Sequence, residues 1–323
     1  MSLRSYFKLP QRTLRGDSLG ITTANTATAS AAVITRADDG TLRLKAVESF
    51  DGASALSTLS RWQHGSAWRR CRTHLLLDDA HYQLLPVDAP DVPEAELSDA
   101  LRWQVKDLIG YPAEDASIGS VLVPAASESI RTRQAWVVVA RRDTVAERMR
   151  SARDARIELD SIDVPELALR NLALLPSPDG ACALLHVGLQ RSTLVMVWKG
   201  DLCSVRRFDL TAAALLDAAP DQFETLVERL AQDVQRSADA FERHFHAAAL
   251  GRLWVLDEQA GLPLADALAR HITLQVKPMR LSDWIGIDTT RPLMDAKAHI
   301  DFLPAIGAAL RAQGPANTAG VSA

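Results

Sequence analysis

The sequence has no long apolar run and no excess of basic residues. Its longest apolar stretches, such as "AWVVVA" at residues 135–140, are far too short to span a bilayer. The formal net charge over 323 residues is −4, so no domain-wide positive charge is available to release counterions from a nucleic acid. The N-terminus also lacks the apolar segment and small-residue cleavage site of a secretory signal. We therefore expect a cytoplasmic protein that binds no nucleic acid.

Cysteine is also scarce, and no metal-binding spacing is present. Cys71, Cys182 and Cys203 are widely separated and form no Cys-x-x-Cys, which indicates reduced side chains that serve packing. His244 and His246 lie two residues apart on an expected helix, so they project about 200° apart around its axis. We accordingly expect no metal site, no bound cofactor and no catalytic residue.

The order of expected elements occurs twice in the chain. At 323 residues, the length exceeds what one hydrophobic core usually serves, so two or more lobes are expected. From residue 19, three strands joined by turns are followed by a helix and a strand at residues 74–77. From residue 181, the strands "ACALLHVG", "STLVMVW" and "LCSVRRF" precede a long helix and the strand "RLWVL". This repetition predicts the α/β class, with duplicated lobes built on mixed sheets.

An expected insertion interrupts the first half, because residues 81–163 have no counterpart in the second. This segment contains "LRWQVKDLIGYPAEDA", residues 101–116, in which apolar positions follow helical spacing. The predicted buried stripe is Leu97, Leu101, Val105 and Leu108. Gly110 is expected to cap the helix in the left-handed conformation, and Arg102 and Lys106 are expected to face solvent or a ligand.

The predicted domain boundaries follow from this organisation. They are residues 1–17 for a basic tail, 18–80 and 164–180 for the first lobe, 81–163 for an inserted αβ subdomain, 181–313 for the second lobe and 314–323 for a disordered tail. The final helix of the second lobe is a candidate to pack back on the first lobe.

Four stretches carry a resemblance to a known family. They are "LRWQVKDLIGYPAEDA", "IDVPELALRNLALLP", "LAQDVQRSADAFERHF" and "FLPAIGAALR". In this order, the chain resembles the actin-like (ribonuclease H-like) ATPase superfamily, in the branch that includes the cell-division protein FtsA. More narrowly, it resembles the PilM family of type IV pilus assembly proteins and is closest to MshI, the counterpart in mannose-sensitive haemagglutinin (MSHA) pilus biogenesis.

The resemblance implies a cytoplasmic assembly protein that is recruited to the inner face of the inner membrane by its partner. In that family, the insertion and the first lobe form a groove for the extended N-terminal peptide of a PilN-like membrane protein. The candidate groove residues here are Arg102, Trp103 and Lys106.

The nucleotide loops of the actin-like superfamily are altered in this sequence. Such loops use Asp-x-Gly-Thr in each lobe and a Gly-Gly turn in the second, because glycine admits phosphate and carboxylates organise hydrated magnesium. Thr22 and His186 occupy the two aspartate positions, while Asp257 and Glu258 replace the glycine pair. The full set of altered or retained loop positions is Thr22, Thr23, Ala24, Asn25, His186, Gly188, Gln190, Asp257 and Glu258. We therefore expect little or no binding of ATP with magnesium, and no ATPase activity.

The leading prediction is a scaffold of a type IV pilus inner-membrane assembly platform that binds a PilN-like protein. One alternative is a working actin-like ATPase whose loops bind nucleotide through atypical residues. Another is the actin-like cytoplasmic module of a type II secretion L-type protein. The sequence leaves the stoichiometry and any polymerisation open.

Overall fold

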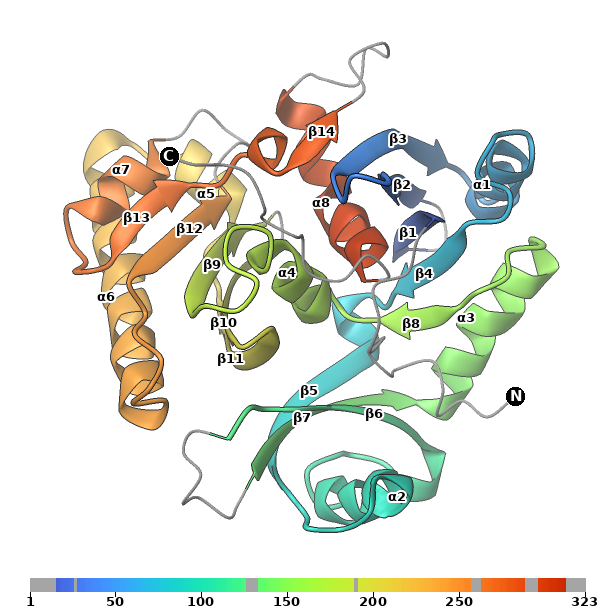
Figure 1. Ribbon diagram of the computed structural model, residues 1–323, viewed down its shortest axis with the longest axis horizontal. Coiled ribbons are helices and arrows are strands. Elements are labelled where there is room, and N and C mark those ends of the chain that lie inside the picture. Colours follow the sequence, from blue (N-terminus) through green and yellow to red (C-terminus); the bar gives the residue numbers. More distant parts are fainter. Residues whose placement is uncertain are drawn as a thin grey trace.

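Two large mixed sheets stand on either side of two central helices, with a smaller third sheet beside them (Figure 1). The computed structural model describes residues 16–25, 28–125, 133–188, 191–256, 263–287 and 296–311. Within these residues, the chain forms an α/β fold in which each large sheet is covered on both faces.

The first sheet has six strands in the order β14-β3-β2-β1-β4-β8. β1, β2 and β3 form an antiparallel meander, and β4 and β8 add in parallel beside β1. The strand bounds are Gly16–Asn25 for β1, Thr28–Arg36 for β2, Leu42–Asp51 for β3, Arg72–Leu76 for β4, Ser161–Asp163 for β8 and Ile285–Ile287 for β14.

The second sheet repeats the core of this arrangement, in the order β11-β10-β9-β12-β13. Its first three strands again form an antiparallel meander, and the next two add in parallel. The bounds are Cys182–Val187 for β9, Ser192–Trp198 for β10, Asp201–Phe208 for β11, Arg252–Leu256 for β12 and Gln275–Pro278 for β13. The duplicated order of elements predicted from the sequence is therefore confirmed.

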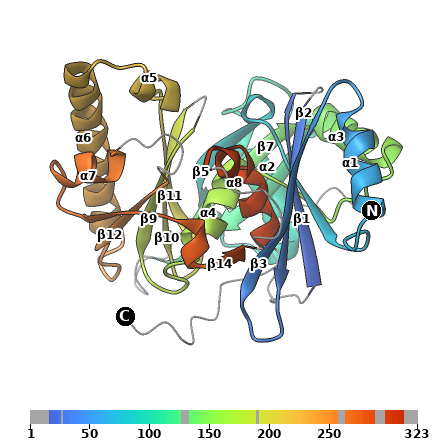
Figure 2. The same cartoon turned by 90° about the horizontal axis from the view of Figure 1, so that it is seen from above.

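The helices form an outer layer on each lobe and a shared layer between the lobes (Figure 2). α1 and α3 lie outside the first sheet, α5, α6 and α7 outside the second, and α4 and α8 between the two. The bounds are Ala55–His64 for α1, Glu94–Val105 for α2, Arg142–Asp154 for α3, Pro165–Ala173 for α4, Ala212–Leu216 for α5, Pro220–His244 for α6, Leu264–Ala269 for α7 and Ala296–Leu310 for α8. Three-residue 3-10 turns occur at Asp79–His81, Ala113–Asp115 and Leu281–Asp283.

Because successive side chains of a strand point to opposite faces, each one packs either against the outer helices or in the central layer. Leu19 and Ile21 of β1 pack in the outer cluster that includes Leu59 of α1. Leu184 of β9 packs in the central cluster shared by both lobes, whereas Leu185 packs outward towards α6. Because both faces of each sheet are covered, the strands read as near-continuous apolar runs.

Helix α8 packs so closely on its neighbours that only glycine fits at two contacts. A Cβ atom added at Gly20 of β1 would lie 2.7 Å from the amide nitrogen of Ala309 and closer still to the carbonyl oxygen of Ala305. On the other side of α8, a Cβ at Gly307 would lie 2.5 Å from the carbonyl oxygen of Ala168 in α4. The last described helix thus joins β1 to α4.

None of the helices in the described part of the chain has both the length and the apolar character needed to cross a membrane.

The third sheet is antiparallel, in the order β5-β7-β6, and carries α2 on one face. Its strands are Tyr82–Ala89 for β5, Ala116–Leu122 for β6 and Arg133–Arg141 for β7. Leu101 and Val105 of α2 are fully buried against strand residues such as Val137 and Val139, as the stripe predicted. β8, which falls inside the expected insertion at 81–163, instead joins the first sheet beside β4. α3 contacts β6 and β7 of the third sheet, while its Ala152 packs in the outer cluster of the first lobe.

The exit of α2 differs from the prediction. The helix ends at Val105, and the turn that follows places Ile109, rather than Leu108, in the small core. The prediction that Leu108 is buried is therefore wrong, since its side chain is 56% exposed. The left-handed cap predicted at Gly110 is also wrong, because the positive-φ glycines of the described chain are at positions 16, 40, 52 and 200.

Candidate functional site

Of the altered loop positions that the structure describes, Thr22 and His186 lie near strand ends on the faces that meet the central layer. Thr22 is on the same face of β1 as Gly20, which contacts α8, and is partly buried, whereas Thr23 is buried. His186 of β9 is on the same face as Leu184, which packs in the shared central cluster. The two lobes therefore present a threonine and a histidine where the resemblance calls for aspartates.

His186 is poorly suited to magnesium. Burial lowers its pKa to about 4, so the imidazole is neutral at pH 7. Its Nε2 atom is buried and has no hydrogen-bond partner within the described part of the chain. Magnesium prefers oxygen ligands, usually carboxylates and waters, and a neutral ring nitrogen does not replace them.

Gly188 has a local structural role in the β9–β10 turn. Its N–H donates to the carbonyl oxygen of Arg191 at 3.1 Å, and a Cβ atom at this position would lie 2.9 Å from that oxygen. The tight turn alone therefore accounts for glycine here. Gln190, Asp257 and Glu258 lie outside the described residues, as do the side chains of Ala24 and Asn25.

A buried ion pair joins the end of β8 to the end of α8. Arg311 donates from Nη1 to the Oδ2 atom of Asp163, and both side chains are almost fully buried. The other oxygen of Asp163 accepts the N–H of Val164 at 2.9 Å. Sequence reasoning missed this pair, although each residue lies within one of the four stretches that carry the resemblance.

A second polar cluster connects the third sheet, the central layer and the second sheet. The Tyr82 hydroxyl donates to Glu166 Oε2 at 2.6 Å, and Arg207 Nε donates to Glu166 Oε1 at 2.8 Å. These residues come from β5, α4 and β11 respectively. Burial, together with the neighbouring Glu166 carboxylate, raises the pKa of Tyr82 well above its ordinary value. The cluster holds the inserted sheet to both lobes through one carboxylate.

Further ion pairs cross between the lobes. Arg191, at the start of β10, pairs with Asp79 beside β5 at 3.1 Å. Arg170 of α4 donates to the carbonyl oxygen of Gly200 and lies 3.8 Å from the Asp201 carboxylate. The interlobe space of the described chain is therefore occupied by helices and by paired charges.

The candidate groove residues, on α2 and directly after it, differ in whether their side chains are free to contact a ligand. Trp103 is 72% exposed, and the Lys106 ammonium lies 5.2 Å from the centre of its ring. Arg102 instead turns back towards its own subdomain, where Nη1 donates to the carbonyl oxygens of Ala113 and Ala116 at 2.7 and 2.8 Å. The expectation that Arg102 faces solvent or a ligand is thus corrected, because its guanidinium closes the turn after α2.

Comparisons with known proteins bear on the fold. No family model matches the chain, and no curated protein matches it. A solved structure of the PilM-PilN type IV pilus biogenesis complex is similar over 94% of this chain and 100% of that chain, with a TM-score of 0.68 and 20% identity. The shared fold is the actin-like α/β fold that the duplicated sheets also indicate, so the predicted fold class is confirmed.

Two more distant structures have lower scores. The cytoplasmic domain of EpsL, an inner-membrane component of the type II secretion system of Vibrio cholerae, matches over 79% of this chain and 94% of its own, with a TM-score of 0.47 and 15% identity. A protein of Bacteroides thetaiotaomicron with an actin-like ATPase fold and unknown function matches over 88% of this chain and 95% of its own, with a TM-score of 0.44 and 10% identity.

Proposed function

We propose that this chain is a non-catalytic scaffold of the inner-membrane assembly platform of a type IV pilus, of the MSHA type and related to MshI. In this role it binds the N-terminal cytoplasmic peptide of a PilN-like membrane protein, which recruits it to the inner face of the inner membrane. The observation that supports this proposal most is the fold shared with the PilM-PilN structure over the whole of that chain.

The non-catalytic part of the proposal rests on the residues between the lobes. A magnesium nucleotide needs oxygen ligands for the metal and a backbone that phosphate can approach. At the two aspartate positions stand Thr22 and His186, and the imidazole is neutral at pH 7. Asp163, a buried carboxylate of the same region, is paired with Arg311. These residues do not fit the metal.

The proposed peptide site involves the outer surface of α2. Trp103 offers a large exposed ring beside Lys106, and Leu108 adds a second exposed apolar side chain in the following turn. Exposed aromatic anchors of this kind supply much of the binding energy at protein interfaces. An extended peptide would gain affinity from main-chain hydrogen bonds along a sheet edge and specificity from such apolar contacts.

The register of β5 and β7 allows a clean test. Tyr82 pairs with Ala140 and Gln83 with Val139, so the two ends of the inserted sheet lie side by side. Replacing residues 84–138 with Asn-Gly should close a hairpin at this point and retain the Tyr82 hydroxyl for Glu166. The synthetic N-terminal peptide of a PilN-like protein is immobilised and offered to both proteins, with circular dichroism confirming that the shortened variant folds. We expect capture of the intact protein alone, whereas equal capture of both would place the peptide site elsewhere.

A further inference from the structure

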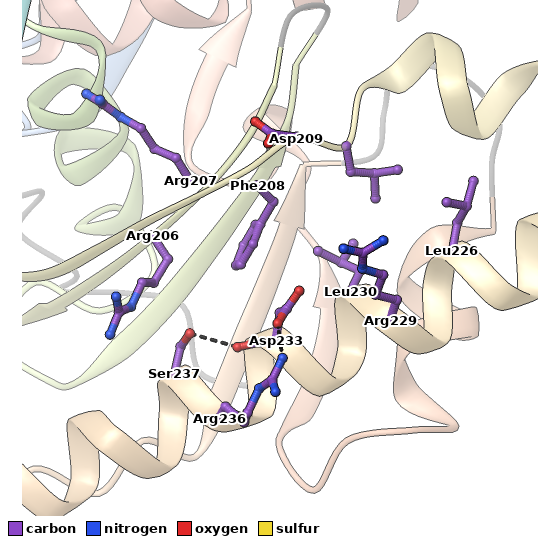
Figure 3. A pocket seen from close by; sticks show the side chains of 11 residues that line it. Arg206, Arg207, Phe208, Asp209, Leu226, Arg229, Leu230, Asp233, Arg236 and Ser237 are labelled. Atoms are coloured by element: carbon purple, nitrogen blue, oxygen red, sulfur yellow. Dashed lines mark hydrogen bonds and ion pairs between the residues drawn. The ribbon is translucent and has the colours of Figure 1, made fainter.

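A groove of about 600 Å³ lies on the second lobe, between β11 and α6 (Figure 3). One wall is the end of β11 and the residues that follow it, at positions 206–210. The other wall is a stripe along α6 whose members recur at helical spacing: Leu226, Arg229, Leu230, Asp233, Arg236 and Ser237. The ring of Phe208 lies between the strand and the helix.

The strand wall is an unpaired edge. Within the described chain, β11 is the last strand of the second sheet and pairs only with β10. An edge strand presents main-chain N–H and C=O groups that can pair with an added strand. Arg206 and Phe208 project to the α6 side of β11, since Phe208 packs in the cluster that contains α6, while Arg207 projects to the other side, towards Glu166.

The groove is positively charged and has an apolar floor. Four arginines and two aspartates line it, on a chain whose overall charge is −4. Arg207 is paired with Glu166, and Arg236 with Asp233. The remaining charged side chains of the lining are Arg206, Arg229 and Asp209, and the two arginines have no carboxylate partner among the described residues. Beneath them, Leu230 is buried and Phe208 and Leu226 are partly buried.

The ends of this chain do not complement the groove. Residues 1–17 carry Arg4, Lys8, Arg12 and Arg15, whose charge would oppose that of the groove arginines. Residues 314–323 carry no charged side chain. An occupant matched to the groove has an extended backbone that carries both acidic and apolar side chains at alternate positions, because only every second residue of a strand points to the same face.

We propose that this groove is a second docking surface, which binds an acidic, extended segment of another protein as a strand added along β11. The side chains at every second position of that segment face α6, where the apolar ones enter the space over Phe208 and Leu230 and the carboxylates meet Arg206 and Arg229. The surface is separate from α2, so the proposal goes beyond the binding of a PilN-like peptide.

The first test uses a designed probe, the labelled peptide Thr-Glu-Thr-Leu-Thr-Glu-Thr, in fluorescence anisotropy at low salt. Its glutamates and its leucine all point to one face when the peptide is extended. We expect saturable binding that weakens as salt rises from about 50 to about 300 mM, because salt screens exposed charges. A lysine version of the peptide should not bind. A version methylated at every amide nitrogen should lose at least tenfold in affinity, because it cannot pair with a strand edge.

The second test places the binding on the groove. The double variant Arg206→Glu, Arg229→Glu should bind the probe at least about tenfold more weakly, since each reversal turns an attraction into a repulsion. Its matched control is Arg142→Glu, Arg243→Glu, which changes the net charge equally at exposed sites outside the groove and should bind normally. Amide hydrogen exchange should slow in β11 when the probe is bound.

Three results would overturn the proposal. The first is equal affinity of the two double variants for the probe. The second is undiminished binding of the methylated probe. The third is binding of a single-stranded oligonucleotide of matched charge that is as tight as binding of the peptide. Capture by a PilN-like peptide, measured on the same double variant, should not change. Failure of this proposal is therefore distinguishable from failure of the proposed function.

Discussion

The contact between Gly20 and helix α8 allows a quantitative prediction about how the two lobes are joined. A methyl group at Gly20 would lie 2.7 Å from the amide nitrogen of Ala309 and would overlap the carbonyl oxygen of Ala305. Both are backbone atoms, so no side-chain rotation relieves the clash, and the helix must move away from β1. Overpacking of a core typically costs 1–3 kcal/mol, and this case lies at or above the top of that range. We therefore expect Gly20→Ala to lower the free energy of unfolding by about 3 kcal/mol or more.

The measurement is urea unfolding followed by circular dichroism, with Gly110→Ala as the matched control. A Cβ atom at Gly110 meets no atom within 4 Å, and its φ is not positive, so this variant should stay within about 0.5 kcal/mol of the parent protein. If Gly20→Ala were as stable as the control, α8 would not pack on β1 as described. The account of the central layer would then fail.

The remaining predictions concern the small core, the nucleotide and a second buried histidine, His74 of β4. Leu101→Ala should cost about 2 to 5 kcal/mol by leaving a cavity. Arg102→Ala should cost about 1 to 2 kcal/mol, because two carbonyl oxygens lose a charged donor, and chemical unfolding checks both values. Burial, with Arg311 and Arg72 nearby, lowers the pKa of His74 to about 3, so the native ring stays neutral while the unfolded one takes up a proton below about pH 6.5. Stability should therefore fall by about 2 kcal/mol between pH 6.5 and 5, and an unfolding series of His74→Gln should show a shallower fall. Calorimetric titration with Mg-ATP should show no saturable binding below about 1 mM, and a micromolar constant would contradict the non-catalytic proposal.

The repeated order of strands was predictable because hydrophobic patterning and turn residues act locally. The meanders β1–β3 and β9–β11 could be read from short apolar runs separated by polar turns. The buried stripe of α2 was predictable as far as Val105 for the same reason. Its exit was not, because helical spacing alone does not distinguish Leu108 from Ile109 once the helix has ended.

Local hydrophobic patterns could not predict the polar contacts of the interior. Asp163 and Arg311 are separated by 148 positions, and Glu166 and Arg207 by 41, so nothing local indicates that they pair. The position of α3, which contacts both the third sheet and the outer cluster of the first lobe, also depends on long-range packing that periodicity does not specify. The nucleotide-loop positions were found only through the resemblance, and the structure then gave His186 its buried, neutral environment.

The most direct test of the proposed function is a calorimetric titration of the intact protein with the N-terminal cytoplasmic peptide of a PilN-like protein. The account predicts saturable binding that weakens about tenfold or more in Trp103→Ala, because an exposed aromatic anchor is lost. Leu216→Ala, which removes a similarly exposed apolar side chain from α5 of the second lobe, should bind as the parent protein does. Absence of saturable binding to the intact protein, or equal affinity of the Trp103→Ala and Leu216→Ala variants, would contradict it.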